Sequence, residues 1–408
     1  MPTSLQEFAR DIISQTPTDD VDFATHAVDR LLDQGRGTGA SDLHLQPSEH
    51  SLEISFRIDG VLQSAGLFPG SVAQNVVARL KVLAGLLTYR TDTPQEGRVR
   101  TEGTNAELRV STFPTLYGER AVVRFFMSSE QYRSLDNLGL PEDVEVQLQY
   151  LLNETSGAVL TTGPAGSGKT TTVYACLRYL VDASAAQRSI VSIEDPIEVA
   201  VPGVAQAQVN ANADLDLATG LRFLMRQDPE IIMVGEIRDR ATAEAAMQAS
   251  LTGHLLLSTF HAGSAAEAIS RLSDMGIEPY MLRSGLLGIL SQRLVRRLCE
   301  CASETDDPAL LLGLPVQSAH VPVGCERCGQ TGYSGRAVLA EMLTVQRNDL
   351  GRAILSRSDA GALEHLATAS GMISRWDRAM AALESGITSP AEIRRVLGFQ
   401  SSPTSTGS

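Results

Sequence analysis

The pattern of apolar and polar positions changes character about a third of the way along the chain. Before residue 128, apolar residues follow helical spacing in two segments and alternate with polar residues in several short ones. The segments are 21–34 and 71–87 for the helices, and 43–45, 52–58, 107–113 and 120–126 for the strands. Residues 58–60, Ile-Asp-Gly, are typical of a hairpin turn. We therefore predict a small α+β domain over residues 21–127.

From residue 141 onward, short apolar runs alternate with segments of helical periodicity. That alternation predicts a parallel sheet covered by helices, an α/β architecture. The expected strands are 157–162, 189–194, 231–235 and 254–260. The last hundred residues are predicted to be mainly helical, interrupted by a segment that carries cysteines.

The remaining segments complete the predicted domain organisation. A chain of 408 residues exceeds one ordinary core and favours two or three domains. We expect a flexible N-terminus and a disordered tail of Ser, Thr, Pro and Gly. The predicted ranges are 1–20 for the flexible N-terminus, 21–127 for the α+β domain, 128–140 for a linker, 141–295 for the α/β domain, 296–336 for the cysteine-bearing segment, 337–400 for a helical region and 401–408 for the tail.

Charge and cysteine content narrow the class of protein. The chain has 48 acidic and 34 basic residues, a net charge of −14, which argues against nonspecific wrapping of nucleic acid. No apolar stretch approaches the length of a membrane span, and the first residues lack a signal-peptide core, so we interpret the protein as cytosolic. Five cysteines in such a chain indicate metal binding or free thiols rather than disulfides.

A phosphate-binding loop is the strongest chemical signal. Residues 163–170, GPAGSGKT, satisfy G-x-x-x-x-G-K-[ST], with an apolar strand before them and a periodic helix after. That context makes a chance glycine-rich turn a poor alternative. The backbone would cradle phosphates, Lys169 would reach the β- and γ-phosphates, and Thr170 would ligate Mg²⁺. The predicted nucleotide-binding residues are Gly163, Pro164, Ala165, Gly166, Ser167, Gly168, Lys169, Thr170 and Thr171.

Acidic residues end two of the predicted strands. The run 231–234 leads through Gly235 to Glu236, and a carboxylate there would act at Mg²⁺ or its water. The alternative, a solvent-exposed strand end, is weak beside a phosphate loop. The strand 189–194 ends in Glu194, which we prefer as the residue that orients or deprotonates the attacking water, with Glu198 as the substitute.

Histidines flank the last predicted strand. His254 is its first residue and His261 directly follows it. Each alone is better explained as a hydrogen-bonded structural residue. Because His261 stands at the carboxyl end of a strand, like the other candidates, it could contact the γ-phosphate region.

These motifs together, GPAGSGKTTT, SIEDPIE, DPEIIMVGEIRD and TGHLLLSTFHAG in this order, resemble those of the secretion ATPases that drive type II secretion and type IV pilus assembly. The first domain is similar too, in ASDLHLQP, FRIDGVL, PQEGR and LRVSTFPTLYGERAVVRF. The resemblance extends from about residue 21 to residue 397. Several independent motifs in a fixed order make a chance match improbable.

The resemblance implies a hexameric, Mg²⁺-dependent ATPase with a RecA-like P-loop domain, an N-terminal PAS-like α+β domain and a mainly helical C-terminal region. It implies that ATP lies between the two domains and that Arg98 and Arg109 serve as arginine fingers, although Arg120 and Arg124 are close in sequence. Finger arginines accelerate other systems about 10³- to 10⁵-fold, whereas a single arginine ordinarily pairs with an acid at the surface.

The resemblance also assigns the acids and histidines. Glu194 becomes the catalytic acid of the aspartate box, Glu236 ends the Walker B strand, and His254 and His261 fill the histidine box.

Four cysteines form the candidate zinc site. Assembly-type members of the family bind zinc through two C-x-x-C pairs at this place, whereas retraction motors lack the segment. Cys325 and Cys328 fit, but Cys299 and Cys301 form C-x-C. Four thiolates can still satisfy tetrahedral zinc, and we favour zinc over two pairs of free thiols. Cys176 is predicted to be a buried small apolar residue.

Partners and location follow from the resemblance alone. It implies a homo-hexamer at the inner face of the cytoplasmic membrane, working with an inner-membrane platform protein and a docking protein. Only about 20 residues precede the first expected helix, so docking would use another surface or another protein. The alternatives are a DNA-uptake or conjugation motor, which the acidic balance disfavours, and a nonhydrolysing nucleotide-gated scaffold.

Overall fold

The structure is a computed structural model, and it describes residues 5–100, 107–125, 134–183, 188–345 and 348–399. By contacts, the chain divides into two compact units: Met1–Ser128 with Cys325–Thr331, and Ser129–Gly324 with Gly332–Ser408. The predicted tail and the start of the predicted linker, residues 128–133, lie outside the described residues.

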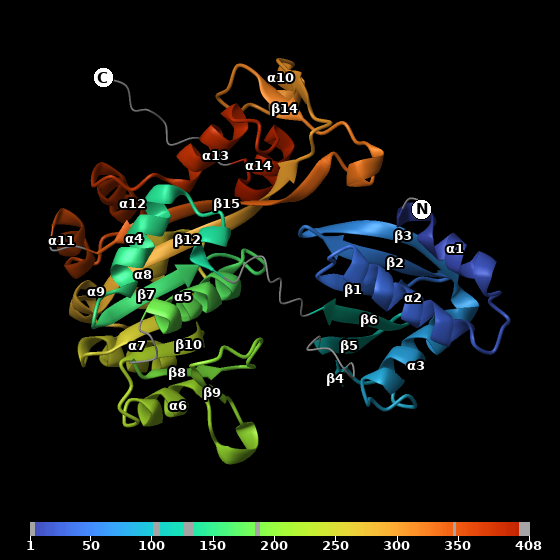
Figure 1. Cartoon of the computed structure of the whole chain (residues 1–408), viewed down its shortest axis with the longest axis horizontal. Helices are drawn as coiled ribbons and strands as arrows, with labels where there is room; N and C mark the ends of the chain where they lie inside the picture. The colour runs from blue at the N-terminus through green and yellow to red at the C-terminus, as the bar shows by residue number, and fades with distance from the viewer. Residues whose placement is uncertain (1–4, 101–106, 126–133, 184–187, 346–347, 400–408) are drawn as a thin grey trace. The chain divides into compact units, whose positions relative to one another are not determined.

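The first unit is built on a six-stranded antiparallel sheet in the order β3-β2-β1-β6-β5-β4 (Figure 1). Leu52, Ile54 and Phe56 of β2 are buried, whereas the residues between them point to the other face, as strand alternation requires. Asp59 and Gly60 form the predicted hairpin turn. The elements are η1 Leu5–Glu7, α1 Phe8–Gln15, α2 Phe23–Gly37, β1 Asp42–Pro47, β2 Ser51–Ile58, β3 Val61–Pro69, η2 Gly70–Val72, α3 Ala73–Leu83, β4 Gln95–Arg100, β5 Glu107–Thr115 and β6 Gly118–Phe125.

The prediction of a flexible N-terminus is wrong for residues 5–15. They form η1 and α1, and Phe8, Ala9 and Ile12 are buried in the core of the first unit. Phe8 and Ile12 lie four residues apart and therefore share one face of a helix. That face covers part of the sheet, so burial of apolar surface outweighs the polar character of the segment.

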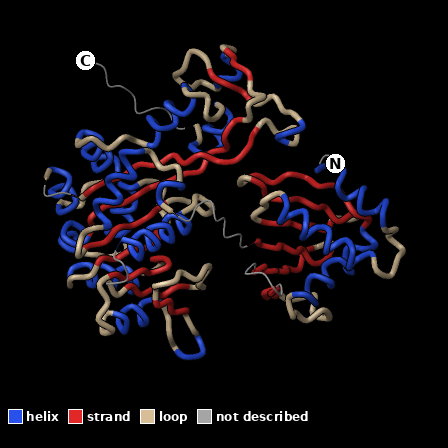
Figure 2. The backbone as a smooth tube through the Cα atoms, viewed as in Figure 1, coloured by secondary structure: helices blue, strands red, loops and turns tan. Residues whose placement is uncertain are grey.

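The second unit contains a seven-stranded sheet in the order β15-β12-β7-β11-β10-β8-β9, with helices on both faces (Figure 2). All neighbours are parallel except β15, which is antiparallel to β12. The elements up to β11 are η4 Leu135–Asn137, α4 Glu142–Leu152, β7 Gly157–Thr162, α5 Lys169–Ala183, β8 Ile190–Glu194, β9 Ala205–Gln208, η5 Ala211–Ala213, α6 Leu217–Leu224, β10 Ile231–Ile237, α7 Arg240–Leu251 and β11 Leu255–Phe260. Those after β11 are α8 Ala265–Asp274, α9 Pro279–Gly285, β12 Leu286–Leu298, β13 Ser303–Thr305, α10 Pro308–Leu311, β14 Ala319–Val321, β15 Tyr333–Thr344, α11 Asp349–Leu355, α12 Ala360–Ala369, α13 Arg375–Glu384 and α14 Pro390–Leu397. The short helix η6 Glu326–Cys328 belongs to the segment assigned to the first unit.

The four strands predicted for this sheet are present, as β7, β8, β10 and β11. Every residue of β7 and β11 is buried, because helices cover both faces of the sheet. The predicted α/β fold with a parallel sheet is confirmed. Since parallel strands share a direction, the loops after β7, β8, β10 and β11 all emerge at one edge.

Two predicted boundaries are wrong because they fall inside strands. The boundary at 295/296 cuts β12, and that at 336/337 cuts β15. These strands pair over most of their length and extend the sheet beyond β7. The region predicted to be helical therefore begins with a strand, and its helices start at α11.

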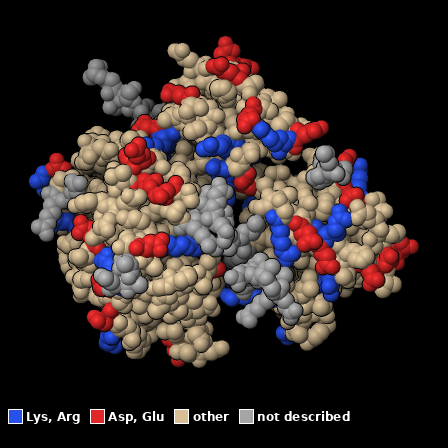
Figure 3. All heavy atoms as spheres, in the orientation of Figure 1, with Lys and Arg blue, Asp and Glu red and all other residues tan. Residues whose placement is uncertain are grey.

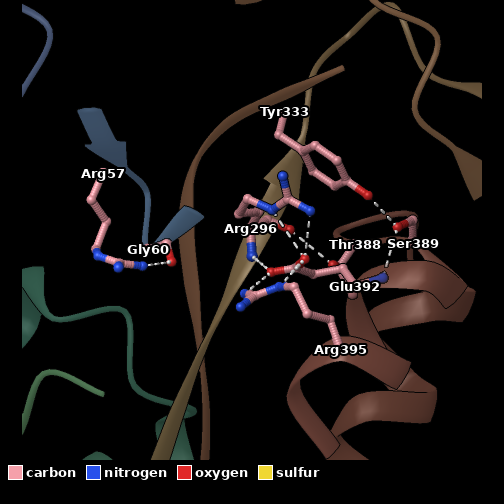
Figure 4. A network of polar contacts seen from close by, with 8 residues as sticks. All are labelled: Arg57, Gly60, Arg296, Tyr333, Thr388, Ser389, Glu392 and Arg395. Carbon is pink, nitrogen blue, oxygen red and sulfur yellow. Dashed lines mark hydrogen bonds and ion pairs between the residues drawn. The ribbon is translucent and has the colours of Figure 1, made fainter. Parts of the chain in front are cut away.

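An ion-pair cluster joins α14 to β12 (Figure 4). Glu392 is fully buried and accepts hydrogen bonds from the backbone and guanidinium of Arg296 and from Arg395. The Arg296 guanidinium also lies 3.8 Å above the ring of Tyr333, whose hydroxyl is 2.6 Å from Ser389 Oγ. The end of the chain that the structure describes is thereby fixed to the sheet.

Charged side chains of both signs are interspersed on the face drawn in Figure 3. Among the described residues on that face, no broad basic area stands out. This distribution agrees with the acidic balance of the whole chain, which carries a net charge of −14.

Candidate functional site

The phosphate loop connects the carboxyl end of β7 to the first turn of α5. Gly168 has φ +87°, a left-handed conformation that glycine adopts without strain, and a Cβ there would lie 3.0 Å from Gln292 Nε2. A Cβ on Gly163 would lie 2.5 Å from the carbonyl oxygen of Gln292. Glycine is therefore required at both positions, so that the loop can fit against β12 while its amides stay available to an anion.

Lys169 lies inside the curl of this loop. Its Nζ donates hydrogen bonds of 2.9 Å to the carbonyl oxygens of both Gly163 and Pro164. Burial lowers the pKa of the Lys169 ammonium, and the carboxylate of Glu236 partly opposes that shift. Ser167 Oγ is buried and has no hydrogen-bond partner among the described residues. A buried cation beside a buried hydroxyl without a partner fits a phosphate ligand.

A cavity of about 110 Å³ lies beside the loop, at the edge where the strands end. Loops and strands far apart in the sequence contribute its walls, because β7, β11, β10 and β8 are neighbours in the sheet. Its polar lining consists of Thr170 and Tyr174 from α5, Glu194 at the end of β8, Asp195 and Glu198 after β8, Glu236 and Arg238 at the end of β10, and Thr259 of β11. The structure thus brings together the predicted metal-binding threonine and all three candidate acids.

A β-bulge explains why the apolar strand β10 ends on a carboxylate. The register with β11 shifts between Val234 and Glu236, and Thr259 Oγ1 donates to the carbonyl of Gly235. Glu236 accepts a 2.9 Å hydrogen bond from Arg238, which raises the pKa of that guanidinium, and lies 2.8 Å from His261 Nε2. The carboxylate is therefore held at the cavity rather than released into solvent.

Glu194 is buried and held by three side chains. Tyr174 Oη donates to its Oε2, while Ser192 Oγ and Gln206 Nε2 lie 2.7 and 2.9 Å from its Oε1. Burial raises the pKa of Tyr174, and the hydrogen bond to Glu194 raises it further. The phenol is therefore a permanent donor. Glu198 also lines the cavity, so the choice between the two acids stays a prediction.

The structure separates the two histidines. His261 follows β11 at the edge that carries the cavity, and Arg271 donates to its backbone carbonyl. His254 precedes β11 and lies 3.0 Å from the carbonyl oxygen of Ala249. Six strand residues separate the two ends by about 20 Å, so His254 does not line this cavity. Its catalytic role stays a prediction.

The two predicted finger arginines lie in the first unit. Arg98 of β4 and Arg109 of β5 face each other across an antiparallel pair. Arg109 also forms an ion pair with Glu96. Their role as fingers stays a prediction.

Several residues that line the cavity or contact its acids were not predicted from the sequence, among them Tyr174, Arg238 and Gln206. Tyr174 follows Thr170 by four residues and so shares its helix face, a spacing that could have identified it. Arg238 stands two residues after Glu236, and nothing in the sequence marks it as the partner of that acid. Gln206 belongs to the edge strand β9 and carries no local signal.

The four predicted metal ligands converge. The Sγ atoms of Cys299, Cys301, Cys325 and Cys328 all lie within 4.8 Å of one another. Those of Cys325 and Cys328 are 3.7 Å apart, close to the edge of about 3.8 Å that Zn–S bonds of 2.3 Å give in a tetrahedron. The cluster is compatible with a bound metal ion, and the C-x-C spacing does not prevent the four thiols from meeting.

Fold and site define a P-loop nucleotide hydrolase of the RecA type. A family model described as "Type II/IV secretion system protein" matches residues 18–395, nearly the whole chain. The chain belongs to this family, and it is an ATPase.

Relatives of known name agree with this assignment, and a solved structure has the same fold. "Type II secretion system protein E" of Pectobacterium carotovorum is 44% identical over 81% of this chain and 67% of its own length. "Type IV pilus assembly ATPase TfpB" of Acinetobacter baylyi is 40% identical over 94% of this chain and 67% of its own length. The solved Legionella pneumophila ATPase DotB has a similar fold, with a TM-score of 0.66 and 21% identity over 93% of this chain and 97% of its own.

In the part of the chain that the structure describes, no helix combines the length and the apolar character that crossing a membrane requires.

Proposed function

We propose that the chain is a hexameric motor that hydrolyses ATP to power assembly of a type II secretion pseudopilus or a type IV pilus. The observation that carries the proposal is the meeting of Thr170, Glu194 and Glu236 at one cavity beside the phosphate loop. Relatives of both kinds, at 44% and 40% identity, support the two alternatives equally.

In this proposal the loop 163–170 binds the phosphates of ATP through its amides and Lys169. Thr170 and Glu236 would hold Mg²⁺, which would supply positive charge at the phosphates. Glu194 orients the attacking water and accepts its proton, and Tyr174 fixes the direction of that carboxylate. His261 lies within reach of the same region through its contact with Glu236. Arg98 and Arg109 would supply finger guanidiniums.

The cysteine cluster is proposed to hold a structural zinc ion. Four thiolates leave no open coordination position, which is typical of structural rather than catalytic zinc. Cys299 directly follows β12, and the chain re-enters the sheet at β15. A metal ion bound by the four cysteines would therefore cross-link the long connection between these two strands.

The proposed partners are five further copies of the chain, an inner-membrane platform protein and a docking protein. The names of the relatives support such a machine, which would place the protein at the inner face of the cytoplasmic membrane. Direct contact with nucleic acid is not part of the proposal, because the chain has 48 acidic residues against 34 basic ones.

One experiment tests the central claim. The purified chain is assayed for Mg²⁺-dependent ATP hydrolysis and its mass is measured by light scattering, with and without a reconstituted platform protein. We expect slow turnover, a hexamer, and stimulation by the platform. Hydrolysis that double-stranded DNA stimulates strongly, and that salt suppresses, would instead support a nucleic-acid motor.

A further inference from the structure

Two adjacent residues of β12 lie beside the loops that enclose the candidate site. β12 is the neighbour of β7, with Leu290 opposite Thr161 and Ser291 opposite Thr162. The phosphate loop begins where β7 ends, whereas β12 continues. Gln292 therefore lies level with the start of that loop.

Because side chains alternate along a strand, Gln292 and Arg293 point to opposite faces of the sheet. Leu290, two residues before Gln292, packs in the core on the α5 side. Ile289, four residues before Arg293, packs in the core that contains α7 and α8. The adjacent residues Gln292 and Arg293 can therefore contact different loops on the two faces of the sheet.

Gln292 holds the phosphate loop. Its Nε2 donates a 2.7 Å hydrogen bond to the carbonyl of Ser167, and its Oε1 accepts a 3.0 Å hydrogen bond from Thr172 Oγ1. The side chain is 2% exposed, so water cannot replace either bond. A primary amide supplies a donor and an acceptor at this spacing, which neither a carboxylate nor an alkyl chain can do.

Arg293 holds the loop that follows His261. Its guanidinium donates a 2.7 Å hydrogen bond to the carbonyl oxygen of Gly263. Arg375 of α13 donates to the same oxygen, and the amide of Gly263 donates to Glu267. The carbonyl and the amide of Gly263 are therefore both hydrogen-bonded. Gly263 lies two residues after His261, which contacts Glu236.

We propose that Gln292 and Arg293 form a two-sided clamp, in which Gln292 positions the phosphate loop for nucleotide binding and Arg293 positions the His261 loop for hydrolysis. The clamp rests on the proposed ATPase site. Neither residue is placed against the reacting atoms, so both are positioning residues. Loss of Gln292 should weaken nucleotide binding, whereas loss of Arg293 should slow hydrolysis. Residues that only stabilised the fold would not separate these two effects.

The test measures two quantities on the full chain: the Kd for a fluorescent ADP analogue, and kcat for ATP hydrolysis at saturating ATP. Gln292→Ala should raise Kd about tenfold or more, because a buried loop carbonyl loses its partner. Arg293→Ala should leave Kd within about twofold and lower kcat about tenfold or more. Arg293→Lys should recover part of kcat, since an ammonium can still donate to Gly263.

Thr172→Val provides a second measurement should Gln292→Ala not fold, because it removes only the hydroxyl that orients the amide. It should raise Kd without changing kcat. Gln248→Ala and Arg352→Ala, at exposed positions of α7 and α11, are the matched controls and should change neither quantity.

Equal effects of the Gln292 and Arg293 variants on both quantities, or no effect on either, would overturn the clamp. A wild-type chain that binds the analogue but hydrolyses no ATP would overturn the proposed function and the Arg293 half. The role of Gln292 is tested by nucleotide binding alone, which does not require hydrolysis. A failure of the clamp can therefore be distinguished from a failure of the proposed function.

Discussion

His261 Nε2 lies 2.8 Å from Oε1 of Glu236, at the point where two adjacent parallel strands of the sheet end. The same carboxylate accepts a hydrogen bond from Arg238 through its other oxygen. Glu236 thus has a nitrogen atom close to each of its oxygens while it still lines the cavity beside Thr170. A carboxylate held in this way is positioned before any ligand arrives.

Replacing Glu236 by Gln should abolish most turnover while leaving nucleotide affinity largely intact. The amide keeps the size of the side chain but removes the negative charge at the cavity. We expect kcat to fall by about 10² or more, the lower range of losses when a catalytic acid–base group is removed. Steady-state ATPase assays and binding of a fluorescent ADP analogue provide the two readouts. An unimpaired Glu236→Gln enzyme would refute the placement of this acid.

The choice between Glu194 and Glu198 can be decided by a matched pair of variants. Glu194→Gln should lower kcat by about 10² or more, and Glu198→Gln by less than about tenfold. The reason is that Tyr174, Ser192 and Gln206 fix the direction of the Glu194 carboxylate. kcat at saturating ATP is the measurement. The reverse order of the two losses would assign the role of base to Glu198.

The phosphate loop and the acids at the strand ends could be predicted because their signals are local. In β10, the apolar and buried residues 231–234 run directly into Gly235 and then Glu236, so the chain itself marks where the carboxylate lies. The sequence also indicates that His254 and His261 stand at opposite ends of one strand, and a strand of six residues separates those ends by about 20 Å.

The contacts that orient the acids could not be predicted in the same way. Gln206 and Tyr174 meet Glu194 only because β9 and α5 pack against β8, and no spacing in the sequence encodes that meeting. β12 and β15 were missed for a related reason. They contain polar residues such as Gln292 and Glu341, which in a sequence suggest exposed positions. In the structure both are buried, because they form hydrogen bonds with the backbone of a loop and of a helix start.

The cysteine cluster predicts a measurable metal content. Elemental analysis of the purified chain should find about one zinc ion per chain, and Cys325→Ser should lose it and lower Tm. Cys176→Ser is the matched control, because Cys176 is buried in α5 and is not one of the four clustered thiols. Wild-type protein without zinc, or equal zinc in both variants, would contradict the assignment.

The buried carboxylate of Glu392 predicts how stability depends on pH. Burial alone would raise its pKa, but hydrogen bonds from Arg395 and Arg296 outweigh burial, and the net pKa is lowered from 4.5 (Figure 4). A carboxyl group whose folded-state pKa is depressed stabilises the protein above its unfolded pKa. That contribution is lost as the pH falls through the folded-state value.

Glu392→Gln should therefore lower the free energy of unfolding at pH 7, by about 3 kcal/mol, because two arginines lose a buried partner. The difference between variant and wild type should shrink as the pH falls below 4.5, since the unfolded wild-type chain then binds a proton that the folded chain resists until its lower pKa is reached. Denaturant unfolding at several pH values measures both effects. Asp349→Asn, which breaks the exposed pair with Arg352, is the control and should change stability little at any pH. A Glu392→Gln deficit that stays constant down to pH 3 would mean that the lost stability comes from packing rather than from the charge.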